Sequence, residues 1–103
     1  MNLDQEIGDW RREIDQIDGE LLGLLNRRAE IASRVLKLKR NAGLAICDPQ
    51  RELEVVCRAR QDNPGPLDGQ AIERIFRCIV HEVRNAEELE NERLTAQGEK
   101  SNG

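Results

Sequence analysis

The fold is decided by a long stretch near the start of the chain, LDQEIGDWRREIDQIDGELLGLLNRRAEIASRVLKLKRN, residues 3–41. Its apolar residues recur at alternating steps of four and three, which places them along one side of an α-helix. This stripe comprises Leu3, Ile7, Trp10, Ile14, Ile17, Leu21, Leu24, Ile31, Val35 and Leu38. The pattern predicts one helix over residues 3–41, which ends where Asn41 and Gly43 supply stop signals.

Two shorter helices are predicted from the rest of the chain. Asp48 is suited to cap a helix and Pro49 to its first position, and the Asn63-Pro64-Gly65-Pro66 run stops that helix. A third apolar stripe starts at Ile72 and fades into a polar tail. The three predicted helices span residues 3–41, 49–62 and 68–94. We therefore expect an all-α chain with three helices in one domain, residues 1–95, and a disordered tail over residues 96–103.

Composition narrows the class of protein. The chain has 103 residues, of which 35% are charged, only one Trp, one Phe and no Tyr. A net charge of −4 disfavours nucleic-acid binding, and the acidic start and the absence of a long apolar run argue against export and against a membrane span. Three cysteines cannot all pair with one another, so a reduced, cytoplasmic protein is expected.

The length of the first helix predicts a partner chain. A helix over residues 3–41 would be about 58 Å long, whereas a compact domain of this size is only about 34 Å across. A folded monomer would leave much of the apolar stripe in water. The simplest partner is a second copy of the chain, and we expect a two-fold homodimer.

One position of the stripe is occupied by a cation. Arg28 stands where the period requires an apolar residue, and Lys39 follows eleven residues later, about 16 Å along the axis and on the same side of the helix. The two cations are therefore spaced to hold opposite ends of one small anion. The alternative is that Arg28 extends to the surface or pairs with a buried glutamate.

The segment DPQRE, residues 48–52, contains a charge that its own helix opposes. Arg51 falls in the first turn, where the helix dipole is already positive and an acidic residue would be favoured. Without another role, Asp48 would be a helix cap, and Arg51 and Glu52 would be surface charges. A requirement for a cation at a binding site would explain Arg51.

Five pieces of the sequence, in order and at matching separations, resemble the all-helical class of chorismate mutases. They are IDQID at 14–18, LLGLLNRR at 21–28, the spacing from there to Lys39, DPQRE at 48–52, and PLD with AIERIFRCIVHE within 66–82. The resemblance covers roughly residues 5–90. It implies an intertwined homodimer of three-helix subunits that rearranges the dianion chorismate to prephenate, with no metal and no cofactor.

The resemblance also implies a site shared between two chains. Arg28 and Lys39 would come from one chain and Arg11, in DWRREI, from the partner, with the two arginines holding the substrate carboxylates and Lys39 facing the ether oxygen. The spacing on the helix agrees with this. Arg11 is about 26 Å from Arg28 along the axis and turned by about 100°, so it cannot join the same site from its own chain. The alternative for Arg11 is an exposed surface arginine.

The two shorter helices would supply the remaining site residues. By resemblance, Asp48 and Glu52 handle the ring hydroxyl of the substrate, and Arg51 points into the cationic pocket. On the third helix, Val83 and Glu87 stand where serine and glutamine are common in the family, and Glu87 would join Lys39 as the second catalytic residue by donating to the ether oxygen. The alternatives are that Val83 belongs to the core and that Glu87 begins an acidic run.

Two other functions are compatible with the sequence. An isochorismate–pyruvate lyase has the same fold and nearly the same cations, and release of pyruvate from isochorismate would identify it. A non-catalytic helical dimerisation module would need the apolar stripe but not the cations. Because the chain shows no second catalytic domain and no regulatory module, a stand-alone chorismate mutase is the expected function.

Overall fold

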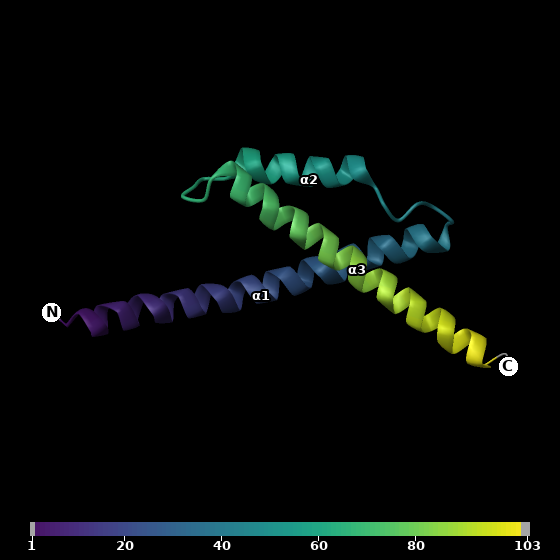
Figure 1. Ribbon diagram of the computed structural model, residues 1–103, viewed down its shortest axis with the longest axis horizontal. Coiled ribbons are helices and arrows are strands. Elements are labelled where there is room, and N and C mark those ends of the chain that lie inside the picture. The colour runs from purple at the N-terminus through teal and green to yellow at the C-terminus, as the bar shows by residue number, and fades with distance from the viewer. Residues whose placement is uncertain (1, 102–103) are drawn as a thin grey trace. The chain divides into compact units, whose positions relative to one another are not determined.

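The computed structural model describes residues 2–101, and the side chains of residues 2–96, as three helices (Figure 1). They are α1 (Leu3–Asn41), α2 (Pro49–Asp62) and α3 (Gly69–Ser101), and the described residues contain no strand. The all-α prediction is confirmed, and α1 and α2 have the predicted bounds. None of the described helices combines the length and the apolar character needed to cross a membrane.

The chain forms two compact units, one extending to Ile31 and the other beginning at Ala32. The N-terminal unit is a stretch of α1 in which the side chains of the apolar stripe are exposed, from 39% at Ile7 to 69% at Leu3. No residue of α1 reaches full burial in the single chain. The stripe predicted from the sequence is therefore present as an uncovered apolar surface.

The C-terminal unit contains α2, whose start follows the predicted chemistry. The side chain of Asp48 accepts a hydrogen bond from the backbone N–H of Arg51 at 3.1 Å, and Pro49 occupies the first helical position. Before it, α1 ends at a turn in which Gly43 has a positive φ of 74° and the N–H of Leu44 donates to the carbonyl of Lys39. This turn places Lys39, the last turn of α1 and the start of α2 in one short segment.

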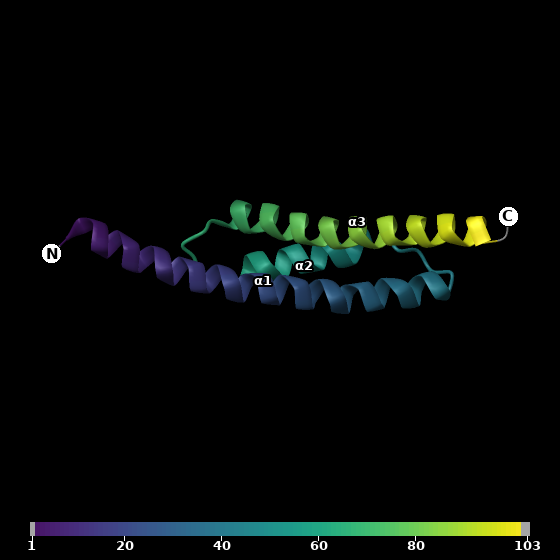
Figure 2. The same ribbon diagram turned by 90° about the horizontal axis from the view of Figure 1, so that it is seen from below.

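Helix α3 begins after the loop that follows α2 and runs back in the opposite direction (Figure 1 and Figure 2). Asp68 caps it by accepting from the N–H of Ala71 at 2.7 Å. Helices α2 and α3 pack together. Among the described residues, Val56 of α2 is the one apolar residue that is buried.

Ion pairs join α2 and α3 near this loop. Glu73 of α3 lies 3.1 Å from Arg60 of α2 and 2.9 Å from Arg77, one turn along α3. The hydrogen bond from Arg77, followed by the charges of both arginines, holds the pKa of Glu73 below its usual value. Glu73 therefore carries its negative charge at neutral pH and ties the two helices together at the surface.

The C-terminal end of α3 differs from the prediction. The helix was expected to end near residue 94 and to be followed by a disordered tail, but α3 continues to Ser101. Residues 95–101 contain no proline and include alanine, glutamine, glutamate and lysine, which favour helices. Residues 102–103 lie outside the described residues, and the domain boundary at residue 95 stays a prediction.

Candidate functional site

Charged side chains gather around the start of α2. The Nζ atom of Lys39 lies 3.5 Å from Oδ2 of Asp48, while Oδ1 accepts the N–H of Arg51. That backbone hydrogen bond is the largest cause of a lowered pKa at Asp48, and the Lys39 charge adds to it. Asp48 is therefore ionised at neutral pH, and Lys39 is held beside the first turn of α2. The structure thus brings together two residues that were predicted to share a site.

Glu52 joins the same cluster through an arginine that was not predicted. Its backbone N–H donates to the carbonyl of Asp48 at 3.0 Å, and its side chain forms an ion pair with Arg84 of α3. The Nη1 atom of Arg84 also lies 3.4 Å from Sγ of Cys47, in the loop before α2. The charged cluster at the start of α2 thus includes Lys39, Asp48, Glu52 and Arg84, with Cys47 beside it.

The side chain of Arg51 contacts its own helix in the single chain. It was expected to point into a cationic pocket, but its Nη1 atom lies 3.4 Å from the carboxylate of Glu54, and both side chains are more than half exposed. Glu54 is three residues further along α2, where a neighbouring acidic side chain is within reach on the helix surface. In this structure Arg51 acts on Asp48 mainly through its backbone N–H.

Glu87 of α3 is the buried charged residue among those described, with only 3% of its surface exposed. Nη1 of Arg40 donates to Oε1 at 2.9 Å, and Oγ of Ser33 donates to Oε2 at 2.7 Å. Both carboxylate oxygens are therefore paired, as a buried charge requires. Ser33 and Arg40 are seven residues apart in α1 and so lie on one face of that helix.

From the sequence, Glu87 and Lys39 were both expected at the ether oxygen of the substrate. In the single chain, the cation that pairs with Glu87 is the residue after Lys39, Arg40. Consecutive residues of a helix point about 100° apart, so the side chains of Lys39 and Arg40 have different neighbours. Val83 is half-buried on α3, one turn before Glu87. Its position suits the apolar alternative considered for it.

The other two predicted residues belong to the N-terminal unit. Arg28, in the apolar stripe of α1, is half-buried. Arg11 is exposed. Exposure leaves Arg11 available to a second chain.

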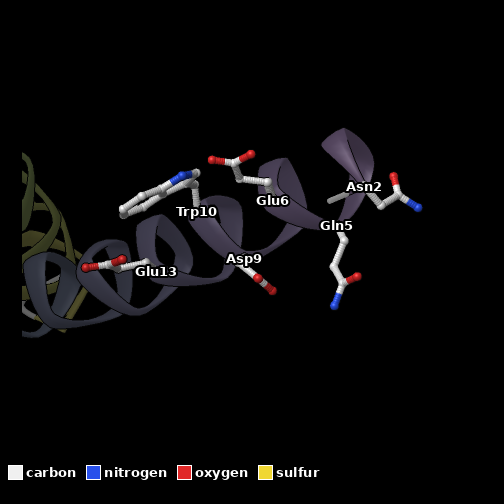
Figure 3. Close-up of a pocket in the computed structure, with 6 residues that line it drawn as sticks. All are labelled: Asn2, Gln5, Glu6, Asp9, Trp10 and Glu13. Atoms are coloured by element: carbon white, nitrogen blue, oxygen red, sulfur yellow. The ribbon is translucent and has the colours of Figure 1, made fainter.

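A hollow along α1 in the N-terminal unit does not have the character of an anion site (Figure 3). Its lining residues are Asn2, Gln5, Glu6, Asp9, Trp10 and Glu13. Figure 3 shows Trp10 and Glu6 pointing to one side of the helix, and Gln5 and Asp9 to the other. The lining thus wraps around a single exposed helix, and its three carboxylates would repel a dianion.

Metal-ligating side chains are not grouped in the part of the chain that the structure describes. No three His, Cys, Asp or Glu residues among residues 2–96 are arranged to hold an ion. Cys47, Cys57 and Cys78 are free thiols on the surface.

The chain is thus an all-helical protein of three helices. Lysine, arginine and carboxylate side chains gather where α1 ends and α2 begins. A sequence profile described as chorismate mutase type II matches residues 10–88. The chain belongs to this family.

Individual relatives agree with the family. The chain is 38% identical over 80 residues to the bifunctional chorismate mutase/prephenate dehydratase of Neisseria gonorrhoeae, a match that covers 78% of this chain and 22% of that protein. It is 33% identical over 57 residues to the chorismate mutase of Methanocaldococcus jannaschii, covering 55% of this chain and 58% of the relative. The chain thus spans about a fifth of the length of the bifunctional relative.

A solved structure shares the fold. The chorismate mutase of Thermus thermophilus superposes with a TM-score of 0.78 at 31% identity, over 81% of this chain and 94% of that one. The match extends the family assignment from sequence to three-dimensional arrangement.

Proposed function

We propose that the protein is a chorismate mutase that rearranges chorismate to prephenate, in the cytoplasm, on the route to phenylalanine and tyrosine. Family membership supports this proposal, and the observation that carries it is the contact of Lys39 with Asp48 beside Glu52. These three residues are the ones that the family pattern assigns to the ether oxygen and the ring hydroxyl. Three free surface thiols suit a reducing compartment.

The reaction asks for positioning and electrostatics rather than for a nucleophile. Chorismate is a flexible dianion that must be folded into a reactive conformation while negative charge grows on its breaking ether oxygen. In the proposed site, Arg28 and the partner subunit's Arg11 hold the carboxylates, and Lys39 donates to the ether oxygen. Asp48, ionised by its lowered pKa, orients both Lys39 and the start of α2.

The first turn of α2 would receive the ring hydroxyl. Asp48 and Glu52 are carboxylates one turn apart, and both lie next to cations. Arg51 would contribute its backbone N–H and the positive charge near Asp48, and Val83 would form an apolar wall on α3. The positive charge of Arg51 lies at the positive end of the helix dipole, which is unfavourable. The nearby carboxylates of Glu54 and Asp48 offset this charge.

We propose that the protein acts as a homodimer, with two copies covering the apolar stripe of α1. The exposed stripe in the single chain supports this, because exposed leucine, isoleucine and tryptophan side chains of this number are unfavourable in water. Each site would then include Arg11 from the other chain.

Coupled folding and association is the first expected result. Each tenfold rise in protein concentration should stabilise the folded dimer by about 1.4 kcal/mol, so the unfolding midpoint should rise with concentration. Ile17→Glu, on the stripe, should favour dissociation. Gln16→Glu adds the same charge one residue away and should have little effect. Sedimentation and thermal unfolding measure both, and a helical monomer with a concentration-independent midpoint would contradict the dimer.

Glu87 is proposed as the second donor to the ether oxygen, through Oε2, while Oε1 keeps its hydrogen bond from Arg40. This role requires the Ser33 hydroxyl to turn away from Oε2, and it predicts a pH dependence. A carboxylic acid donates a hydrogen bond only when it is protonated, whereas an ionised carboxylate would repel the growing negative charge. Wild-type activity should therefore be higher at mildly acidic pH. Glu87→Gln has a permanent N–H donor, and its amide oxygen still accepts from Arg40. This variant should flatten the pH profile and keep or raise activity near neutrality.

The measurement is kcat against pH for both proteins, with circular dichroism as a control for folding. A folded Glu87→Gln dimer that is inactive at every pH would contradict the donor role. So would a wild-type rate that climbs steadily from about pH 5 to 8. Either result would leave Glu87 as a structural partner of Arg40 and Ser33.

Product analysis tests the proposed reaction against its alternatives. The purified protein should convert chorismate to prephenate and should release no pyruvate from isochorismate. Pyruvate release would identify an isochorismate–pyruvate lyase. A folded dimer that is inactive with both substrates would identify a dimerisation module.

A further inference from the structure

Arg84 links three segments of the C-terminal unit. It projects from α3, pairs with Glu52 in the first turn of α2, and lies 3.4 Å from Cys47 in the preceding loop. Only 20% of the Arg84 side chain and 23% of the Glu52 side chain are exposed, so the ion pair is largely shielded from water. An ion pair in this setting is less screened than one on the open surface.

Other arginines of α3 have a different setting. Arg77 pairs with Glu73 one turn away, and about half of its side chain is exposed. That pair is of the surface kind that contributes little. Arg84 instead reaches a residue of another helix, 32 positions earlier in the chain, and that residue belongs to the proposed substrate site.

The pairing leaves one oxygen of Glu52 open. Arg84 donates to Oε1, and no residue in the described part of the chain donates to Oε2. A carboxylate can accept at both oxygens, so Oε2 keeps its capacity for a hydroxyl group. The fixed Oε1 contact also restricts the rotamers of Glu52 before substrate arrives.

Charge gives the pairing a second effect. Asp48 and Glu52 place two carboxylates in one turn, and both would repel a dianionic substrate. Lys39 offsets Asp48, and Arg84 offsets Glu52. Without Arg84, the carboxylate of Glu52 would have no cation beside it, and its Oε2 would face the dianionic substrate with an uncompensated negative charge.

We propose that Arg84 is a positioning residue of the site: it holds Glu52 through Oε1, offsets its charge, and so presents Oε2 to the ring hydroxyl of the substrate. This inference rests on the proposed function. Arg84 acts through Glu52 and makes no contact with the substrate itself, so its contribution is to binding in ground state and transition state alike.

The test is the variant Arg84→Gln, with Arg77→Gln as the matched control on the same helix. Arg84→Gln should raise KM for chorismate by about tenfold with kcat changed less than about threefold, because uniform binding is lost. Arg77→Gln should leave both constants near wild type. Arg84→Lys, which keeps the charge, should recover part of the lost affinity. Circular dichroism and sedimentation confirm that the compared proteins are folded to the same extent.

A double-mutant cycle with Glu52→Gln separates the proposed role from direct substrate binding. If Arg84 acts through Glu52, Arg84→Gln should have almost no further effect on KM in the Glu52→Gln background. A tenfold loss that persists there would mean that Arg84 binds substrate itself, and would overturn the inference. An unchanged KM in the folded single variant Arg84→Gln would overturn it as well. A wild-type protein inactive with chorismate would overturn the proposed function and this inference together, whereas an active wild type beside an unaffected variant would overturn the inference alone.

Discussion

Lys39→Ala is expected to lower kcat/KM for chorismate by about 10²–10³-fold, with most of the loss in kcat, because it removes the cation that meets the charge growing on the ether oxygen. The matched control is Lys37→Ala. Lys37 lies two residues away in α1, pairs with Glu90 at 3.8 Å and is 44% exposed, so its loss should leave activity near wild type. Steady-state kinetics on the two variants measures the contrast.

The ion pair of Lys39 with Asp48 requires a check on structure. Lys39→Gln keeps a neutral N–H donor of similar reach and should recover part of the activity that Lys39→Ala loses. Equal helix content in wild type, Lys39→Ala and Lys39→Gln would show that the substitutions lower the reaction rate and do not unfold the protein. Lys39→Ala with more than about a third of wild-type kcat would contradict the assigned role.

Arg11→Ala and Arg28→Ala homodimers should each retain below about 1% of wild-type activity, yet a mixture refolded together should regain about a quarter of it. Random association makes half of the dimers mixed, and each mixed dimer holds one intact site of two. The expected loss in each homodimer follows from removing a charge-assisted, two-donor contact to a substrate carboxylate. The measurement is specific activity before and after joint unfolding and refolding.

The control for this experiment is Arg12→Ala, mixed with Arg28→Ala in the same way. Arg12 is adjacent to Arg11, is exposed and pairs with Asp9, so its variant should be active before mixing. Mixed dimers that form but show no regained activity would mean that Arg11 does not act across the interface. Activity in the Arg11→Ala homodimer would exclude Arg11 from the site altogether.

The helices were predictable because their signals are local. The three-and-four spacing from Leu3 to Leu38 and the stop at Gly43 defined α1, and Asp48-Pro49 defined the start of α2. Gly43 takes the positive φ that its type allows at low cost. The end of α3 was missed because a polar composition was interpreted as disorder, although its residue types favour a helix.

The candidate site was predictable only in part. Lys39, Asp48 and Glu52 were identified from motif and spacing, and the structure brings them to one place. Arg84, Arg40 and Ser33 were missed because each pairs with a residue more than 30 positions away, and sequence periodicity describes only neighbours on one helix. No feature of the sequence distinguished Arg84 from the other arginines of α3.

Glu87 shows how tertiary context selects a partner. Its place on α3 was predicted from the sequence, and in the single chain the cation that pairs with it is Arg40. Lys39 and Arg40 are both cations near the end of α1, and their side chains point in different directions from the helix axis. Side-chain contacts between α3 and the last turns of α1, which include Ser33 with Glu87 and Lys37 with Glu90, set which cation lies beside Glu87.

The central claim is tested most directly by the loss of chorismate absorbance on addition of the purified protein, with prephenate identified as the product and Lys39→Ala run alongside. The proposed function predicts that wild type consumes chorismate catalytically, yields an equal amount of prephenate and needs no added cofactor, while Lys39→Ala is slower by at least about 10²-fold. A folded wild-type dimer that leaves chorismate unchanged, or consumes it without forming prephenate, would contradict the claim.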